Sequence, residues 1–323
     1  MSSIDSIKMP ISGEMKRFET FFRAAMKSPV PLLDIILNYM IRRKGKQMRP
    51  MIVFLSAKLT GEINQSTFIA ASLIELLHTA TLIHDDVVDE TYERRGIFSI
   101  NALWKSKVAV LVGDYLLSKG LLLAIENNET ALLKIVSVAV REMSEGELLQ
   151  IEKSRKLDIS EDDYFEIIRK KTATLIASSA ACGAESSGAD ETVVEKMRLF
   201  GEYTGTAFQI RDDIFDYHKK GSIGKPTGND IKEKKITLPL IYTLNKISLS
   251  DKKRILKIIS KKHNDHNISE IIKCVIENKG LDYAEKKMND YREKAIGILD
   301  LFDDCEAKSS LTDLVNYSTT RNF

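Results

Sequence analysis

The 323-residue chain contains few of the residues that interrupt or cross-link a fold: six prolines, 16 glycines and three cysteines. So few prolines and glycines argue against a turn-rich β protein. The cysteines, Cys182, Cys274 and Cys305, are too widely spaced to suggest a disulfide framework or a cysteine-based zinc site. A reducing, cytoplasmic location is therefore expected.

The chain also lacks an excess of charge of one sign, because its formal net charge is only +2. The net charge therefore gives no indication that the protein binds a nucleic acid. The N-terminus has no basic segment followed by an apolar core, so no signal peptide is expected. The most apolar runs, 69–83 and 108–125, contain charged residues and are interpreted as buried core helices, so no transmembrane segment is expected.

The apolar residues recur with the period of an α-helix. Hydrophobic residues make up 43% of the chain and charged residues 29%, as in folded globular proteins. Spacings of three and four place six residues in one apolar stripe: Ile69, Leu73, Leu76, Ala80, Ile83 and Val87. Segments 193–209 and 269–299 are also expected to be helical, with a long loop over 221–235 and a solvated helix and loop over 251–266. Without strand–helix alternation, the fold is expected to be all-α, a helical bundle in one domain over residues 1–323.

Two aspartate clusters carry the strongest chemical signal, Asp85-Asp86-Val87-Val88-Asp89 and Asp212-Asp213-Ile214-Phe215-Asp216. Asp makes up 22 of the 323 residues, so about 0.1 such patterns are expected by chance in a chain of this length. On a helix the first and last aspartates of each cluster share a face, where they repel one another unless a cation neutralises them. Carboxylate oxygens completed by water and phosphates suit Mg²⁺. A solvated acidic face is the alternative, but the apolar residues within the clusters argue against it.

Metal ions bound in this way usually hold a phosphorylated ligand, so basic side chains are expected elsewhere. Lys46 and Arg49 end a basic run, which could also be a solvated stretch. Arg94 and Arg95 follow the first cluster, and arginine forms the better fork for a diphosphate. Lys225 and Lys235 lie in or beside the Gly-rich segment after the second cluster, and such a loop can close over phosphates.

These motifs, in this order, resemble the trans-isoprenyl diphosphate synthase family. The resemblance covers residues 45–239, and the C-terminal helices expected over 250–323 carry no motif. Its motifs are Gly45-Lys46-xx-Arg49-Pro50, DDxxD with Arg94-Arg95-Gly96, Gly113-Asp114, Gly146-Glu147-xx-Gln150, Lys171-Thr172, Phe208-Gln209-xx-DDxxD, Gly224-Lys225-Pro226-x-Gly228-x-Asp230 and Lys235-x-Thr237-Leu238-Pro239. The segment 78–84 is similar to the long-chain, octaprenyl-type branch. Lys234 departs from the pattern, because the family often has Gly there, and leaves open which lysine faces the site.

The resemblance implies roles for individual residues. Three Mg²⁺ ions, with Mn²⁺ as an alternative ion, are expected. Asp85 and Asp89 would hold two of them with Asp86 in support, and Asp212 would hold the third, with Asp213 and Asp216 bound to it directly or supporting its ligands. The allylic diphosphate would be clamped by Arg94, Lys171, Lys225 and Lys235, and isopentenyl diphosphate by Lys46, Arg49, His78 and Arg95. The oxygen dipoles of Thr172 and Gln209 would face the allylic cation, and Lys171, Thr172, Gln209 and Lys225 are the expected catalytic residues. His78 has a second interpretation as a core histidine.

The residues one turn before Asp85 are expected to set product length, because the growing chain would run back along the helix from its diphosphate. Ala80 and Thr81 are small and would not block the tunnel for the growing prenyl chain. The closed end of the tunnel is expected further along, near Leu77 or a neighbouring leucine. One helical turn of about 5.4 Å is close to one isoprene unit. The expected product is therefore a long all-trans-polyprenyl diphosphate of C30–C50, a quinone side-chain precursor. Ordinary core packing is the alternative role of Ala80, because it also lies on the apolar stripe.

Several alternatives stay open at this stage. A farnesyl or geranylgeranyl diphosphate synthase would use the same machinery to make a shorter product. A non-catalytic regulatory subunit of a heteromeric synthase would be expected to lose a cluster or its lysines, and none is lost here. A terpene cyclase usually has a different second metal motif, and a helical scaffold explains none of the basic motifs. The expected partners are isopentenyl diphosphate, a farnesyl or geranylgeranyl primer and a second copy in a homodimer.

Overall fold

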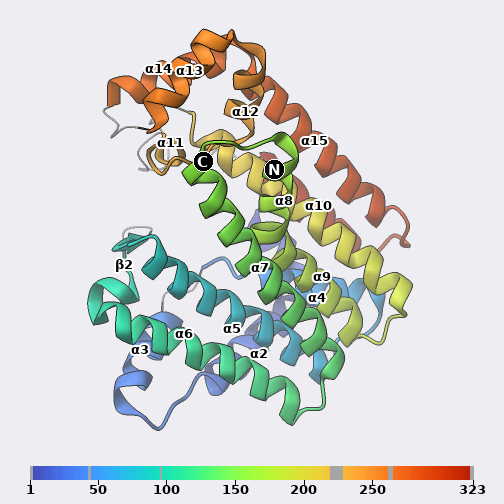
Figure 1. Cartoon of the computed structure of the whole chain (residues 1–323). Coiled ribbons are helices and arrows are strands. Elements are labelled where there is room, and N and C mark those ends of the chain that lie inside the picture. The colour runs from blue at the N-terminus through green and yellow to red at the C-terminus, as the bar shows by residue number, and fades with distance from the viewer. Residues whose placement is uncertain (1–2, 43–44, 95–96, 219–227, 261–264, 321–323) are drawn as a thin grey trace. The chain divides into compact units, whose positions relative to one another are not determined.

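The computed structural model describes residues 3–42, 45–94, 97–218, 228–260 and 265–320, and almost all of them are helical (Figure 1). Within these ranges the only strands are β1 (Glu93–Arg94) and β2 (Ile97–Phe98), a two-stranded antiparallel ladder. The all-α prediction is therefore confirmed. The chain divides into two compact units, and the expectation of a single domain over the whole chain stays a prediction.

Unit 1 comprises residues 1–140, 178–198 and 302–313, and unit 2 the residues 141–177, 199–301 and 314–323. The helices wholly within unit 1 are α1 (Ile4–Lys8), η1 (Met9–Ile11), α2 (Ser12–Ala25), α3 (Pro31–Ile41), α4 (Met48–Thr60), α5 (Gln65–Val88) and α6 (Ile100–Glu126). Those wholly within unit 2 are α8 (Glu161–Ile168), η2 (Arg169–Ala173), α11 (Asn229–Lys232), α12 (Leu238–Lys246), α13 (Leu249–Ser260), α14 (Asp265–Glu277) and α15 (Gly280–Leu299). Residues of both units occur in α7 (Thr130–Lys156), α9 (Thr174–Ser186), α10 (Glu191–Phe215) and α16 (Glu306–Thr320).

Helix α5 carries the predicted apolar stripe and ends at the first aspartate cluster. It begins with a capping box, in which Asn64 accepts a hydrogen bond from the Thr67 N–H and the Asn64 N–H donates to the Thr67 hydroxyl. No proline or glycine interrupts it, so it runs without a break to Val88. It stops because Glu90 adopts a left-handed conformation, with φ of 49°.

Helix α6 runs antiparallel to α5 and packs closely against it (Figure 1). Two glycines make the approach possible. A Cβ at Gly113 would collide with the His84 ring, and one at Gly120 would lie 3.1 Å from a Leu73 methyl group. The core between these helices contains Leu76, Ala80, Ile83, Ala109, Val112 and Leu116.

Helices α5 and α6 are both long and apolar enough to cross a membrane by length and composition alone. In α5, 67% of the most apolar window is buried, as expected of a core helix, whereas in α6 the share is only 33%. The expectation that both are buried core helices is therefore correct for α5 and only partly correct for α6. Along α6 an apolar face reaches solvent, formed by Leu103, Val110, Leu111, Leu121, Leu122 and Ile125.

The core of unit 2 surrounds the C-terminal half of α10, which contains the predicted helix 193–209. Ile210 and Ile214 of α10 are fully buried there, together with side chains from α8 and from α11 to α15. The segment 269–299 is helical as predicted, but it is divided between α14 and α15 where Lys279 turns with φ of 60°. In the predicted loop 221–235, residues 229–232 form α11, and residues 219–227 lie outside the described ranges.

Candidate active site

The first aspartate cluster lies at the C-terminal end of α5. Asp85 and Asp86 are in the last turn, and the N–H of Asp89 bonds to the Asp85 carbonyl at 2.8 Å, so the chain keeps helical spacing up to Asp89. The last turn contains no basic residue. Carboxylates at a helix C-terminus face the negative end of the helix dipole and each other, so a cation would relieve both repulsions.

The three carboxylates of this cluster differ in exposure. Asp89 is exposed and its side chain forms no hydrogen bond or ion pair with the part of the chain that the structure describes. Asp85 is half-buried, and Asp86 is buried with 8% of its surface exposed. The Asp86 carbonyl accepts a hydrogen bond from the Thr91 N–H at 2.9 Å, which fixes the chain just after the helix. Asp85 and Asp89 can therefore offer oxygens to solvent more readily than Asp86.

The predicted isopentenyl-site residues Arg49 and His78 are in contact. Nη1 of Arg49, in the first turn of α4, lies 2.9 Å from Nε2 of His78 on α5. Because a guanidinium can only donate, Nε2 must be the acceptor, and His78 is then neutral with its proton on Nδ1. Lys46 is exposed just before α4, Arg95 is outside the described ranges, and of Arg94 only the backbone in β1 is described.

Glu75 also belongs to this arrangement, although its role was not predicted from the sequence. It precedes His78 by three residues, so both side chains lie on one face of α5. Burial raises the pKa of Glu75, and the nearby Arg49 charge opposes the rise without cancelling it. The signal in the sequence was a single acid inside a long apolar run, one turn before a predicted functional histidine.

The second aspartate cluster lies at the C-terminal end of α10 and is held quite differently. Asp213 is buried, with 5% of its surface exposed, and both its oxygens accept hydrogen bonds. Tyr164 donates to Oδ2 at 2.7 Å, and Nε2 of Gln209 donates to Oδ1 at 2.8 Å. Burial raises the pKa of Asp213 to about 7, and the charges of Asp212 and Asp216 add to the rise, while the two hydrogen bonds oppose it.

Asp216 is engaged as well. Its Oδ1 and Oδ2 accept the backbone N–H groups of Asn229 and Asp230 at 2.9 and 3.0 Å, so it fixes the start of α11. Asp212, by contrast, is exposed and its side chain has no hydrogen-bond or ion-pair partner in the described ranges. The six predicted metal ligands are therefore not equivalent, and in unit 2 the available carboxylate is that of Asp212.

Lys171 and Thr172 lie in η2, a π-helical turn between α8 and α9. The Thr172 hydroxyl donates to Oε1 of Gln209 at 2.7 Å, which links it through Gln209 to Asp213 and Tyr164. The sequence predicted Thr172 and Gln209 as site residues, and the structure brings them together. It did not single out Tyr164, which lies 49 positions from Asp213 in the chain.

Each described lysine of the predicted allylic site has a carboxylate partner in unit 2. Lys171 pairs with Glu147 and also approaches Oε1 of Gln150 at 3.5 Å. Lys235 pairs with Glu233 at 2.5 Å. Lys234 is exposed, whereas the Lys235 side chain is 24% exposed, so Lys235 is the more enclosed of the two. Lys225 is outside the described ranges.

The carboxylates of both clusters suit a divalent cation. Asp89 and Asp212 offer exposed oxygens at helix C-termini, without a hydrogen-bond or ion-pair partner among the residues that the structure describes. Hard oxygen donors in small numbers are the ligands of Mg²⁺ and Ca²⁺. Within the described ranges, no group of three or more His, Cys, Asp or Glu side chains is already assembled around one point. Water and a phosphorylated ligand would therefore have to complete the coordination of any such ion.

Comparison with known proteins agrees with this arrangement. A family model described as polyprenyl synthetase matches residues 30–275. The octaprenyl diphosphate synthase of Haemophilus influenzae is 31% identical to this chain over 324 residues, covering 100% of this chain and 98% of that protein. The chain therefore belongs to the polyprenyl synthetase family and is an enzyme that transfers prenyl groups. The resemblance to its long-chain branch, drawn from the motifs, is confirmed.

Solved structures give the same result for the fold. The polyprenyl synthase of Caulobacter crescentus, solved with calcium and isoprenyl diphosphate, matches with a TM-score of 0.91 at 31% identity, covering 99% of this chain and 98% of that one. A geranylgeranyl pyrophosphate synthase from Bacteroides thetaiotaomicron matches with a TM-score of 0.85 at 37% identity, covering 99% and 100%. A protein named polyprenyl synthase and one named geranylgeranyl pyrophosphate synthase thus share this fold.

Proposed function

We propose that the protein condenses isopentenyl diphosphate head-to-tail with an allylic diphosphate and repeats the step to make a long all-trans-polyprenyl diphosphate. In each step the allylic C–O bond breaks and diphosphate leaves. The isopentenyl double bond then forms a new C–C bond to the allylic carbon, and a proton is lost to the released diphosphate. The observation that supports this best is the pair of aspartate clusters at the ends of α5 and α10, each with exposed carboxylate and with basic side chains in the same unit.

The metal ions are proposed to be Mg²⁺, held by Asp85 and Asp89 in unit 1 and by Asp212 in unit 2. Bound Mg²⁺ supplies positive charge that stabilises the departing diphosphate. Asp86, Asp213 and Asp216 are proposed to support these ligands, because Asp86 is buried and the oxygens of the other two are already hydrogen-bonded. A total of three ions is part of the proposal.

The basic residues are proposed to bind the two substrates. Lys171 and Lys235, with Arg94 and Lys225, would hold the allylic diphosphate, after exchanging their carboxylate partners for phosphate oxygens. Arg49 and His78, with Lys46 and Arg95, would hold isopentenyl diphosphate. A diphosphate bound there would compete with His78 for the Arg49 guanidinium. The hydroxyl of Thr172 and the amide of Gln209 would present their oxygen dipoles to the allylic cation.

Product length is proposed to be C30–C50, with farnesyl or geranylgeranyl diphosphate as primer. Ala80 and Leu77 on α5 are almost fully buried, and Ala80 packs in the core between α5 and α6. Thr81 is half-buried, and its hydroxyl donates to the His78 carbonyl at 2.9 Å. We propose that this side of α5 limits product length. The 37% identity to a geranylgeranyl pyrophosphate synthase keeps a shorter product as the alternative.

A homodimer is proposed through the exposed apolar face of α6, defined above. Six large apolar side chains there are between 40% and 68% exposed, and such a contiguous patch is typical of a protein interface. The proposed location is the cytoplasm. Light scattering should give the mass of two chains for the wild type and the mass of one chain for Leu111→Lys. A wild-type monomer would contradict the interface.

The function is tested by mixing the protein with isopentenyl diphosphate, Mg²⁺ and either a farnesyl or a geranylgeranyl primer. Released diphosphate reports turnover, and mass spectrometry of the dephosphorylated products reports their length. Products of six to ten isoprene units are expected. Products of three or four units would favour the short-chain alternative, and no product with either primer would favour a non-catalytic subunit.

A further inference from the structure

The turn that carries Lys171 and Thr172 requires support, because it is not an ordinary α-helical turn. In η2 the N–H of Thr174 bonds to the carbonyl of Arg169, five residues earlier. Such π turns are rare single-turn features inside α-helices and are often found at functional sites. The question is which contacts favour this turn over a regular helix.

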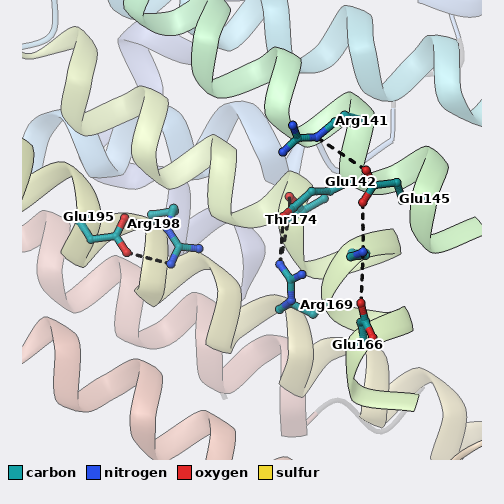
Figure 2. Close-up of polar contacts among 9 residues, drawn as sticks. Arg141, Glu142, Glu145, Glu166, Arg169, Thr174, Glu195 and Arg198 are labelled. Atoms are coloured by element: carbon teal, nitrogen blue, oxygen red, sulfur yellow. Dashed lines mark hydrogen bonds and ion pairs between the residues drawn. The ribbon is translucent and has the colours of Figure 1, made fainter. Parts of the chain in front are cut away.

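The carboxylate of Glu142 contacts both ends of the π turn (Figure 2). Nη1 of Arg169 lies 3.2 Å from Oε1 and 3.3 Å from Oε2, and the Thr174 hydroxyl donates to Oε2 at 2.8 Å. Two residues five positions apart point about 140° away from each other on an α-helix, where one carboxylate could not hold both. In a π turn the bond between these same two residues brings them together. Glu142 is therefore matched to the π turn and not to an α-helix.

Charge and packing strengthen the same arrangement. Burial raises the pKa of Glu142, but the hydrogen bonds from Thr174 and Arg169 and the charges of Arg169 and Lys170 outweigh this, and the pKa is lowered overall. Lys170 bonds to Glu145 at 3.0 Å and pairs with Glu166 at 3.2 Å. Charge-assisted contacts are stronger than hydrogen bonds between neutral groups.

Helix α7 also approaches the turn very closely. A Cβ at Gly146, one turn after Glu142, would lie 2.8 Å from the Lys170 Cβ and 2.9 Å from the Lys171 nitrogen. Glycine at this motif position therefore allows the backbone of the π turn to rest against α7. Glu142 and Gly146 lie on the same face of α7, and both contact the π turn or the residue that follows it.

We propose that Glu142 is a positioning residue whose carboxylate holds the π turn closed and so fixes the directions of Lys171 and Thr172. This inference rests on the proposed roles of those two residues. If the turn relaxed to an α-helix, the residues before it would rotate by about 100° relative to those after it. Lys171 and Thr172 would then lose their present contacts with Glu147 and Gln209.

The test uses the full chain with Glu142→Gln, which keeps an acceptor oxygen but loses the charge, and Glu142→Leu, which loses both. Glu195→Gln is the matched control, because Glu195 forms a single ion pair with Arg198 at 2.8 Å (Figure 2). We expect Glu142→Leu to lower kcat on the order of 10- to 100-fold, as expected of a misplaced catalytic group, with the KM for isopentenyl diphosphate within about twofold. Glu142→Gln should have a smaller effect, and the control none.

Two further measurements separate positioning from simple stabilisation. Hydrogen exchange should accelerate in the peptide 168–176 in Glu142→Leu and not in the control. In a background that carries both Lys171→Ala and Thr172→Ala, with kcat measured on the residual activity, Glu142→Leu should lower kcat by less than about threefold, because a residue that acts through others adds little once they are gone.

The proposal is overturned if Glu142→Leu keeps the wild-type kcat and the wild-type exchange rate. It is also overturned if Glu142→Leu lowers kcat as steeply in the protein that lacks both the Lys171 and the Thr172 side chains. Exchange is measured without substrate, so it tests the contact even if the proposed function fails. A wild-type protein that forms no prenyl product, yet shows faster exchange in Glu142→Leu, would refute the proposed function and retain Glu142 as the residue that holds the turn.

Discussion

The two aspartate clusters have the same sequence pattern and end a helix in the same way, but their surroundings differ. At the end of α5, Asp89 is exposed and its side chain forms no hydrogen bond or ion pair within the described ranges. At the end of α10, Asp213 and Asp216 use all four oxygens as hydrogen-bond acceptors, and only Asp212 is left exposed. A repeated motif therefore does not imply repeated roles. We expect the partners of each aspartate to influence which of them binds a cation.

The largest effect is expected from Asp85→Ala and Asp212→Ala, which remove carboxylates proposed to bind metal in the two units. Each variant should lose several decades of kcat, because several kcal/mol of charge stabilisation is lost in the transition state. Circular dichroism should show an unchanged helical fold. Near wild-type turnover of either variant in saturating Mg²⁺ would remove that residue from the metal site.

Arg49→Ala should raise the KM for isopentenyl diphosphate about 10- to 100-fold, because a charge-assisted hydrogen bond contributes about 1.5–3 kcal/mol. The KM for the allylic substrate should change much less, since Lys171 and Lys235 are proposed to bind it. Arg49→Lys should recover only part of the loss, because an ammonium cannot form the same fork. Equal rises in both KM values would assign Arg49 a shared or structural role.

How far the site could be predicted depended on whether its partners are close in sequence. The spacing within each cluster, the stripe on α5 and the order of motifs are all local patterns, and they led to the fold and the family. Other contacts join segments that are distant in the sequence or irregular in structure. Tyr164 donates to Asp213, and the backbone N–H groups of Asn229 and Asp230 donate to Asp216. No periodic pattern in the sequence indicates such contacts. The sequence could therefore assign Asp213 and Asp216 a place near the metal ions, but it could not identify the groups that occupy their oxygens.

Asp213→Asn sharpens the difference between the clusters through the pH dependence of stability. The folded pKa of Asp213 is raised from 3.8 to about 7, so the folded protein binds an extra proton between these values. Its contribution to stability is fully present below about pH 4 and is lost as the pH rises towards 7. Asp213→Asn removes this titration, so its stability should fall less than that of the wild type over that range. Urea unfolding at pH 4.5 and 7.5 measures the change in the free energy of unfolding, and Asp212→Asn, at an exposed aspartate, is the control. If both variants change the pH dependence of stability to the same extent, the effect does not come from the burial of Asp213.

Ala80→Phe tests whether α5 limits product length in addition to carrying the first cluster. Overpacking the core between α5 and α6 should lower the free energy of unfolding by about 1–3 kcal/mol. If Ala80 also limits the length of the prenyl product, the products of Ala80→Phe should become several isoprene units shorter. Ala109→Phe is the matched control, because Ala109 is equally buried in the same core on α6. A folded Ala80→Phe enzyme with unchanged products would place the limit elsewhere.

The smallest effect is expected at Lys105, in the chain that follows the first cluster. Lys105 adopts φ of 71° and ψ of 162° inside α6, a conformation that is essentially restricted to glycine and costs about 1–3 kcal/mol. The residues around it hold this conformation in place. The Ser106 hydroxyl donates to Oδ1 of Asn101 at 2.9 Å, and Nδ2 of Asn101 approaches the Asp86 carbonyl at 3.4 Å.

Lys105→Gly should relieve the strain, although glycine adds about 0.4–1 kcal/mol of entropy to the unfolded chain. The free energy of unfolding should therefore rise by roughly 0.5–2 kcal/mol, measured by urea denaturation. Lys105→Ala is the control, because it keeps the Cβ and should gain nothing. If both variants gain equally, the lysine side chain and not the backbone is responsible. A Lys105→Gly protein that is more stable but slower would show that the strain helps to hold Asp86 and its neighbours.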